Sequence, residues 1–202
     1  MYNKIKRIFD IFTAVSVGLL LLPLTIIIVL ISAIVYKCKV FFVQERIGYR
    51  NQVFMIYKFR TMCDEIDNKG NLLPYIKRVN PYGEFLRKFS FDEIPQLYNI
   101  LKGDLSLIGP RPLLVAYMGY YTETELLRHS VKPGITGLAQ VYGRNSIQWS
   151  KRFDYDLYYI ENQSFTLDVK IFFKTFIVVL NGQKAHFSKS LIEERMKVLP
   201  AS

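Results

Sequence analysis

The sequence predicts a mostly helical α/β fold: an N-terminal re-entrant membrane helix, then a small cytosolic domain with a β-hairpin and amphipathic interfacial helices. Three observations lead to this fold class. Residues 11–36 carry no charge, two strand-like segments follow on either side of a turn, and later segments have aromatic residues at helical spacing. The 202 residues suffice for one domain and an anchor. We therefore expect a membrane-anchoring helix over residues 1–36 and a cytosolic domain over residues 37–202.

The uncharged segment is long enough for a membrane helix. As a straight helix, residues 11–36 would extend about 39 Å, against a hydrocarbon core of about 30 Å. Pro23, preceded by Leu22, lies near the middle and predicts a kink there. Basic residues flank both ends: Lys4, Lys6, Arg7, Lys37 and Lys39. Because positive residues prefer the cytoplasmic side, the kink and the two basic flanks favour a helix that re-enters one leaflet, although a spanning helix stays open.

The composition limits the partners of the protein. Lys and Arg number 27 against 17 Asp and Glu, a net charge of +10 that suits anionic lipid, nucleic acid or phosphorylated substrates. The two cysteines, Cys38 and Cys63, form no CxxC motif, and the two histidines, His129 and His186, form no spaced pair. A zinc site is therefore not expected. A surface or helix-end position is expected for each histidine, and reduced thiols facing the cytoplasm are expected for the cysteines.

A β-hairpin is predicted directly after the anchor. Val40–Val43 and Val53–Arg60 are rich in β-branched and aromatic residues, and residues 48–52 read as the turn between them. Strand alternation places Lys58 and Arg60 on the same face. Two cations on one face fit either an anion-binding site or a solvated strand.

The rest of the chain is predicted to be mainly helical. A polar loop is expected over residues 64–80. The predicted helices cover Gly83–Phe89, a run that starts at Pro112 and continues to His129, Gln148–Glu161 and Phe165–Leu180, the last opened by Ser164 and closed near Gly182. Their aromatic faces suit either a protein core or the headgroup level of a bilayer.

An adjacent pair of carboxylates, Asp92 and Glu93, stands within SFDEIPQ at residues 90–96. Ser90 and Glu93 match the S-x-x-E capping box, but Pro95 would then disturb the first helical turn. A helix that begins near Asp92 would instead hold both carboxylates at its N-terminus, where negative charge is stabilised. The pair is therefore either a helix cap or a catalytic centre.

Several cations accompany this pair along the chain. Arg111 stands between Pro110 and Pro112, which stiffen the backbone that carries its guanidinium. The wider set of candidate phosphate-binding residues is Lys58, Arg60, Arg87, Arg111 and Arg144. Neither GxGxxG nor GxxxxGK[ST] occurs in the glycine-containing segment at residues 132–145. Carboxylates with arginines indicate Mg²⁺ and a phosphate or diphosphate, with Asp92 and Glu93 as metal ligands.

Four blocks in order resemble the bacterial sugar transferase family, and within it the small monotopic phosphoglycosyl transferases of the PglC type. They are QERIG at residues 44–48, YKFRTM at 57–62, SFDEIPQLYNILKGDLSLIGPRPLL at 90–114 and KPGITGLAQVYGRN at 132–145. The resemblance extends from the apolar N-terminus to about Leu180. The D-E-x-P-Q and G-P-R-P blocks behind such an N-terminus are specific to this family.

The resemblance implies a reaction and the residues for it. A UDP-sugar, expected to carry an N-acetylated amino sugar, would give its phospho-sugar to undecaprenyl phosphate and release UMP, the first membrane step of polysaccharide or glycoconjugate assembly. By this resemblance Asp92 is the nucleophile that forms a covalent phospho-sugar intermediate, and Glu93 assists with Mg²⁺. The remaining matched positions are the cations Lys58, Arg87, Arg111 and Arg144, and Asp156 in a supporting role.

The resemblance also implies a location: the bacterial inner (cytoplasmic) membrane, with a re-entrant helix and the catalytic domain on the cytoplasmic face. Membrane lipid is an expected partner, nucleic acid is not, and a homodimer stays open. The sequence departs from the family at the kink, where Leu22 replaces the usual serine, and at Ile94 and Leu105, which are conservative packing changes. Two other functions stay open from the residues alone: a module that docks anionic lipid or nucleic acid, and a nucleotide-sugar hydrolase.

Overall fold

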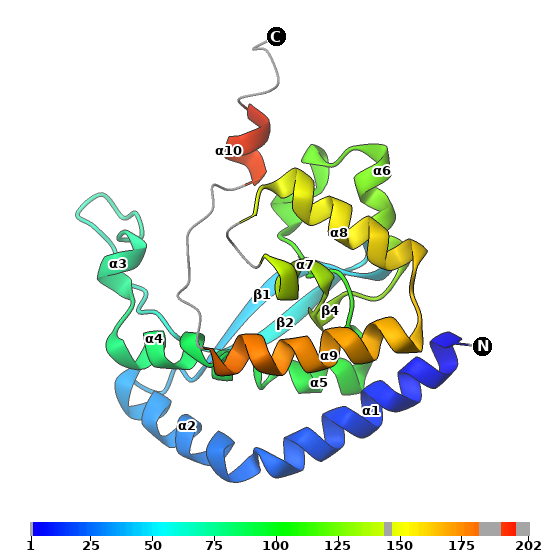
Figure 1. Ribbon diagram of the computed structural model, residues 1–202. Helices are drawn as coiled ribbons and strands as arrows, with labels where there is room; N and C mark the ends of the chain where they lie inside the picture. The colour runs from blue at the N-terminus through cyan, green and yellow to red at the C-terminus, as the bar shows by residue number, and fades with distance from the viewer. Residues whose placement is uncertain (1, 144–146, 182–190, 197–202) are drawn as a thin grey trace.

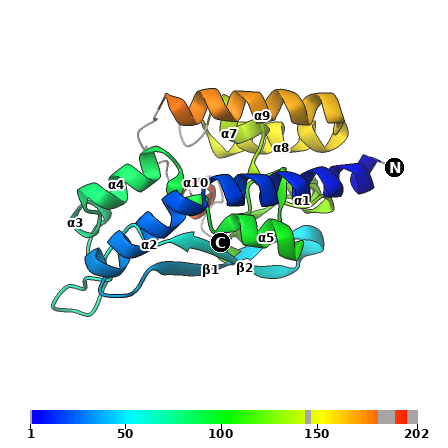
Figure 2. The same cartoon turned by 90° about the horizontal axis from the view of Figure 1, so that it is seen from below.

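The computed structural model describes residues 2–143, 147–181 and 191–196, and this part of the chain is mostly helical, as predicted (Figure 1). It contains two small two-stranded sheets, β1–β2 and β3–β4. Helices α1 (Tyr2–Leu20) and α2 (Leu22–Val35) form a bent pair along one side of the molecule in Figure 1, and α9 (Phe165–Leu180) runs beside α1 (Figures 1 and 2). Strand β2 of the hairpin packs against α5 (Gln96–Lys102), and the hairpin lies on the opposite side of α1 from α8 (Trp149–Glu161) and α9 (Figure 2).

The apolar N-terminus forms two helices, α1 (Tyr2–Leu20) and α2 (Leu22–Val35), bent by 64°. Pro23 lies in the first turn of α2, where its missing N–H and fixed φ are tolerated, so the predicted kink occurs at this proline. Among the described helices, none is individually long and apolar enough to cross a bilayer. The bent pair taken together meets that criterion by length and composition.

Both helices of the bent pair also pack against the rest of the protein. In α1, Ala14 contributes to a core with Ile100 and Leu105. In α2, Ile28 packs in a second core with Phe59 of the hairpin and Leu86. The N-terminal helices are therefore continuous with the folded domain on one face.

The predicted β-hairpin is confirmed. Strands β1 (Phe41–Ile47) and β2 (Val53–Phe59) pair antiparallel with Phe41 opposite Phe59, and a 3₁₀ turn over Tyr49–Asn51 joins them. The first strand continues past the predicted end at residue 43, because its polar residues 44–46 still pair with β2. This extension fixes Gln44 and Arg46, two residues apart, on the same face of the strand.

The parallel pair β3 (Ser106–Ile108) and β4 (Gly134–Thr136) was not predicted. Three residues are too few to show the period-2 pattern of a strand. The two strands approach so closely that a Cβ at Gly134 would lie 2.1 Å from the Gly109 nitrogen. The pair therefore fixes the backbone just before the GPRP segment.

The predicted helix from Pro112 to His129 is wrong. This stretch forms a 3₁₀ segment over Val115–Tyr120, the short helix α6 (Glu123–Leu126) and a second 3₁₀ turn over Leu127–Ser130. Thr122 starts a new helix because its hydroxyl accepts from the Glu125 N–H, while the Glu125 carboxylate accepts from the Thr122 N–H. This capping box divides what the apolar pattern presents as one run.

Three predicted helices are confirmed: α4 (Pro81–Lys88), α8 (Trp149–Glu161) and α9 (Phe165–Leu180). The described residues also form four helices to which the sequence analysis gives no range: α3 (Tyr75–Arg78), α5 (Gln96–Lys102), α7 (Leu138–Tyr142) and α10 (Leu191–Met196). The predicted loop over residues 64–80 is interrupted only by α3. Ser164 caps α9 as predicted, its hydroxyl accepting from the Leu167 N–H. The predicted closure near Gly182 lies outside the described residues.

Large apolar side chains are exposed on three of these helices. They include Ile8, Phe12 and Leu19 on α1, Ile27, Leu30 and Ile34 on α2, and Phe173, Phe176 and Ile177 on α9. Helices α1 and α9 lie side by side, since the Phe9 ring contacts the rings of Phe165 and Phe172. Exposed apolar surface of this extent is typical of an interaction with lipid or protein.

The close packing of α4 against the strand end gives a stability prediction. A Cβ at Gly83 would lie 2.1 Å from the Thr61 carbonyl oxygen. We expect Gly83→Ala to lower the free energy of unfolding by about 1–3 kcal/mol, because backbone on both sides must move. Gly119→Ala is the control, as a Cβ there meets no atom within 4 Å. Chemical unfolding of both variants checks this; equal stabilities would contradict it.

Candidate active site

The carboxylate pair lies on a 3₁₀ turn, Phe91–Glu93, between α4 and α5. Ser90 opens this turn in the left-handed region at φ 57°, and its side chain makes no capping hydrogen bond. Pro95 is the N-cap of α5, so the helix begins after the pair. The capping-box interpretation of Ser90 and Glu93 is therefore wrong, and neither carboxylate is engaged in a helix cap.

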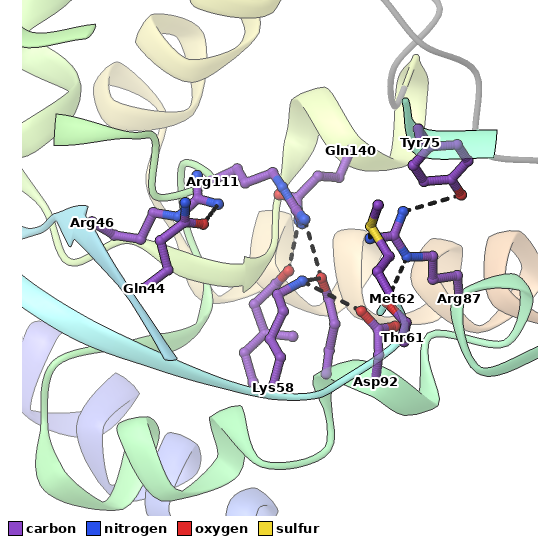
Figure 3. A network of polar contacts seen from close by, with 12 residues as sticks. Gln44, Arg46, Lys58, Thr61, Met62, Tyr75, Arg87, Asp92, Arg111 and Gln140 are labelled. Atoms are coloured by element: carbon purple, nitrogen blue, oxygen red, sulfur yellow. Dashed lines mark hydrogen bonds and ion pairs between the residues drawn. The ribbon is translucent and has the colours of Figure 1, made fainter. Parts of the chain in front are cut away.

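Glu93 binds two cations that come from distant parts of the sequence, Lys58 and Arg111, which are labelled in Figure 3. Its Oε1 accepts a hydrogen bond from Lys58 Nζ at 2.5 Å and another from Arg111 Nη2 at 3.1 Å. Lys58 projects from β2, and Arg111 follows β3 in the GPRP segment. Asp92 Oδ2 lies 3.6 Å from the same Lys58 Nζ, beyond ordinary hydrogen-bond distance. Glu93 is thus held in place, and Asp92 is the less constrained carboxylate.

The pKa values of the two carboxylates are shifted in opposite directions. Burial acts to raise the pKa of Glu93, but Lys58 and Arg111 outweigh it and lower this pKa to about 2. Burial raises the pKa of Asp92, and the neighbouring Glu93 charge adds to the rise, while Lys58 opposes it. Two adjacent carboxylates with separated pKa values are typical of a pair with different chemical roles.

Arg87 lies on the other side of Asp92 (Figure 3). Its guanidinium donates to the Thr61 hydroxyl at 2.8 Å and to the Tyr75 hydroxyl at 3.1 Å. The positive charge of Arg87 also lowers the pKa of Asp92 against the effect of burial. Arg87 therefore contributes to the field at the carboxylate pair without an ion pair to it.

The remaining predicted phosphate-binding residues differ in placement. Arg60 follows the end of β2, and its guanidinium donates to Asp64 at 2.7 Å and to the Lys39 carbonyl at 3.0 Å. It lines the same cavity as Lys58, but Asp64 neutralises much of its charge. Arg144 lies outside the described residues.

The predicted supporting residues occupy structural positions. The Pro110 carbonyl accepts from the Gly134 N–H at 3.0 Å, which ties the GPRP segment to β4. Asp156 of α8 is buried and pairs with Arg128, whose Nη2 donates to its carboxylate at 2.7 Å. The same Nη2 donates to the Arg111 carbonyl at 2.8 Å. Asp156 is thus linked to the Arg111 backbone through Arg128. The other predicted proline, Pro112, follows Arg111 and is buried.

A cavity of about 890 Å³ opens over the carboxylate pair. One part is polar and contains Asp92, Glu93, Lys58, Arg87 and Arg111. The cavity continues between apolar side chains of α1 and α9, which include Val17, Phe172, Phe176 and Val179, and it is also lined by Leu21 at the break between α1 and α2. A single cavity therefore joins charged groups to an apolar channel between two helices.

Sequence reasoning missed other polar residues of the cavity wall. Gln44 and Arg46 on β1, Gln140 on α7 and Arg152 on α8 all line it. Gln44 and Arg46 stand within the QERIG block, but the predicted first strand ended at residue 43. Had that strand been continued, alternation would have placed both side chains on one face.

The carboxylate pair fits Mg²⁺ as a partial ligand set. Among the described residues, no group of three His, Cys, Asp or Glu side chains could hold a metal. Mg²⁺ is commonly held by one or two carboxylates together with substrate phosphates. Asp92 suits this role, while one oxygen of Glu93 is already engaged by Lys58 and Arg111. Any Mg²⁺ here would depend on oxygens from a phosphorylated substrate.

His129 gives a prediction for pH dependence. It lies in the turn over Leu127–Ser130, as a helix-end position predicts, but it is buried, so a surface position is wrong. Burial and the Arg128 charge lower its pKa from 6.5 to about 4. The unfolded chain therefore binds the proton more readily than the folded protein does. The contribution of His129 to the free energy of unfolding should be fully present above about pH 6.5 and should be lost as the pH falls towards 4.

Urea unfolding of the wild type and His129→Gln between pH 7.5 and pH 4.5 checks this expectation. His129 Nδ1 lies 2.6 Å from Asn51 Oδ1, and a glutamine amide preserves a donor there. On acidification, the free energy of unfolding of the variant should fall less than that of the wild type. Identical pH slopes for the two proteins would contradict it.

The comparisons with known proteins identify the family. Residues 1–182 match the model of the bacterial sugar transferases. The chain belongs to this family. It is 48% identical over 195 residues to the uncharacterized sugar transferase EpsL of Bacillus subtilis (strain 168), with 95% of each chain covered.

Relatives with assigned activities match over a part of their length. A UDP-N-acetylgalactosamine-undecaprenyl-phosphate N-acetylgalactosaminephosphotransferase of Aeromonas hydrophila is 39% identical over 90% of this chain and 45% of its own length. A UDP-glucose:undecaprenyl-phosphate glucose-1-phosphate transferase of Klebsiella pneumoniae is 38% identical over 84% of this chain and 39% of its own. The chain thus spans less than half of these two relatives.

Proposed function

We propose that the protein transfers a sugar 1-phosphate from a UDP-sugar to undecaprenyl phosphate and releases UMP. One observation carries the proposal: the cavity over Asp92 and Glu93 continues into the apolar channel between α1 and α9. The charged part suits the diphosphate of the donor and the phosphate of the acceptor, and the channel suits an isoprenoid chain. The names of the Aeromonas and Klebsiella relatives describe this class of reaction.

In the proposed reaction Asp92 is the nucleophile. Its carboxylate oxygen attacks the phosphorus attached to the sugar, the bond from this phosphorus to the bridging oxygen breaks, and UMP leaves with that oxygen. A phosphate oxygen of undecaprenyl phosphate then attacks the same phosphorus and displaces the Asp92 carboxylate. The less constrained position of Asp92, with Glu93 fixed by two cations, supports this assignment.

The cations would act on the charge that develops during transfer. Lys58 and Arg111 lie beside the carboxylates and would bind the phosphoryl oxygens, and Arg87 would act from the opposite side. Asp92, with a contribution from Glu93, would hold Mg²⁺ against the donor diphosphate. The metal would neutralise phosphate charge and help to orient the diphosphate. Arg60 and Arg144 stay in the proposal as phosphate-binding residues.

The proposed location is the cytoplasmic face of the bacterial inner membrane. The bent pair of α1 and α2, together with the apolar side chains of α9, would insert from one side. This arrangement would bring the apolar part of the cavity to the depth of the lipid acceptor. An N-acetylated amino sugar is the proposed donor sugar, and the Aeromonas relative, named for N-acetylgalactosamine, agrees with it.

The experiment is UMP release from a panel of UDP-sugars with Mg²⁺, in nanodiscs, with and without undecaprenyl phosphate. We expect continuous release with lipid and one sugar, and a burst of about one UMP per enzyme without lipid. Continuous release without lipid would instead identify a nucleotide-sugar hydrolase. No release from any UDP-sugar would contradict the proposal.

A further inference from the structure

The cavity has a second cationic region, away from the carboxylate pair. Arg46 and Gln44 extend into it from β1, and their side chains are joined by a hydrogen bond of 2.6 Å from Arg46 Nη2 to Gln44 Oε1 (Figure 3). Arg111 and Lys58 lie between Arg46 and Asp92 in this view (Figure 3). The region therefore belongs to the same cavity, but Arg111 and Lys58 separate it from Asp92.

Two polar atoms of residues that line the cavity are buried and have no hydrogen-bond partner among the described residues: Arg46 Nε on β1 and Gln140 Oε1 on α7. Arg46 Nη1 reaches the Pro112 carbonyl only at 3.5 Å, the limit of a hydrogen bond. Buried donors and acceptors are normally paired, and each unpaired one is destabilising. An unpaired guanidinium N–H and an unpaired amide oxygen, both from residues that line one cavity, indicate a ligand with both acceptors and donors.

The charges point to an anion. The cavity wall carries Arg46, Arg111 and Arg152 in addition to Lys58 and Arg87, against the carboxylates of Asp92 and Glu93. Burial and the nearby charge of Arg111 lower the pKa of Arg46 to about 10. No carboxylate lies within ion-pair distance of Arg46 among the described residues, whereas Arg111 has Glu93. A bound phosphate would offset this repulsion and accept from Arg46 Nε.

We propose that Arg46, positioned by Gln44, binds the phosphate that leaves with the nucleoside, and that Gln140 Oε1 accepts a hydrogen bond from the same donor molecule. This inference rests on the proposed function. The phosphorus under attack must lie at Asp92, and the second phosphate of a diphosphate lies directly beyond it. Because a displacement in line requires the leaving group opposite the nucleophile, the Arg46 region, on the far side of Arg111, receives the leaving phosphate.

A phosphate at Arg46 could come from the nucleotide or from the lipid acceptor, and binding experiments separate the two. Titration of the full-length protein with UMP measures nucleotide affinity without turnover. Arg46→Met should weaken UMP binding about 10–100-fold, the effect of one charge-assisted contact. Arg50→Met is the matched control, since Arg50 is exposed in the hairpin turn and lies over the Tyr49 ring. Arg46→Lys, which keeps the charge, should recover part of the affinity.

Steady-state kinetics complete the test. Arg46→Met should raise the KM for the UDP-sugar and leave the KM for undecaprenyl phosphate unchanged. A raised KM for the lipid alone would overturn the inference and assign Arg46 to the acceptor phosphate. Unchanged UMP affinity in a folded Arg46→Met protein would also overturn it. If the wild type binds UMP but transfers no sugar, the proposed function fails while the nucleotide site stands; if it binds no UMP, both fail.

Discussion

Asp92→Asn should reduce UMP release by about 10³-fold or more while the protein still folds and binds membrane. The expected loss is large because an amide cannot form the covalent phospho-sugar intermediate, and removal of a nucleophile leaves only binding and electrostatic contributions. The change keeps the shape of a side chain that is 8% exposed. It also removes a carboxylate whose charged form burial disfavours, so the free energy of unfolding should change little. A stopped assay for UMP, with and without undecaprenyl phosphate, measures the effect.

The matched control is Asp154→Asn, because Asp154 is an exposed carboxylate on α8 whose side chain is 64% exposed. Glu93→Gln gives a second comparison. It removes the acceptor of Lys58 and Arg111, so it should lower the rate of both half-reactions without preventing a burst of UMP. A normal burst in Asp92→Asn would exclude this residue as the nucleophile and direct attention to Glu93.

The sequence predicts those elements that have their own local signal. The hairpin follows from β-branched strands on either side of a turn, and α9 follows from the Ser164 cap and an apolar run of sufficient length. The β3–β4 pair has no such signal, since it depends on two backbones meeting at Gly109 and Gly134. The prediction of one helix from Pro112 is wrong although a local signal is present. The apolar spacing suits a single helix, but the Thr122 cap starts a new one.

The candidate site depends on contacts between distant residues. Lys58, Glu93 and Arg111 meet across separations of 35 and 18 residues, and no local pattern shows this. The resemblance of ordered sequence blocks to a family brought these residues together. The alternation of the strand places Arg60 on the same face as Lys58, as an anion-binding residue would be. Asp64, four residues further along the chain, nevertheless forms an ion pair with the Arg60 guanidinium and would compete with a phosphate for it.

The second large effect is expected at the buried ion pair of Arg128 and Asp156. The two side chains are 1% and 3% exposed, and Arg128 Nε and Nη2 both donate to Asp156 Oδ2. Asp156→Asn leaves the guanidinium buried without its counter-charge, which should lower the free energy of unfolding by about 3–5 kcal/mol. For a chain of this size the unfolding midpoint should fall by roughly 10 °C. Thermal unfolding in detergent measures it, with the exposed Asp154→Asn as control.

A double variant separates stability from positioning. Arg128→Met with Asp156→Leu removes both charges, and replacing a buried pair by apolar residues often restores stability. It still lacks the donor that holds the Arg111 carbonyl at 2.8 Å. We therefore expect the double variant to unfold near the wild-type midpoint but to show a raised KM for the UDP-sugar, because Arg111 is less well placed. Wild-type kinetics in a stable double variant would show that the pair contributes to stability alone, and an undiminished midpoint in Asp156→Asn would contradict the ion-pair argument itself.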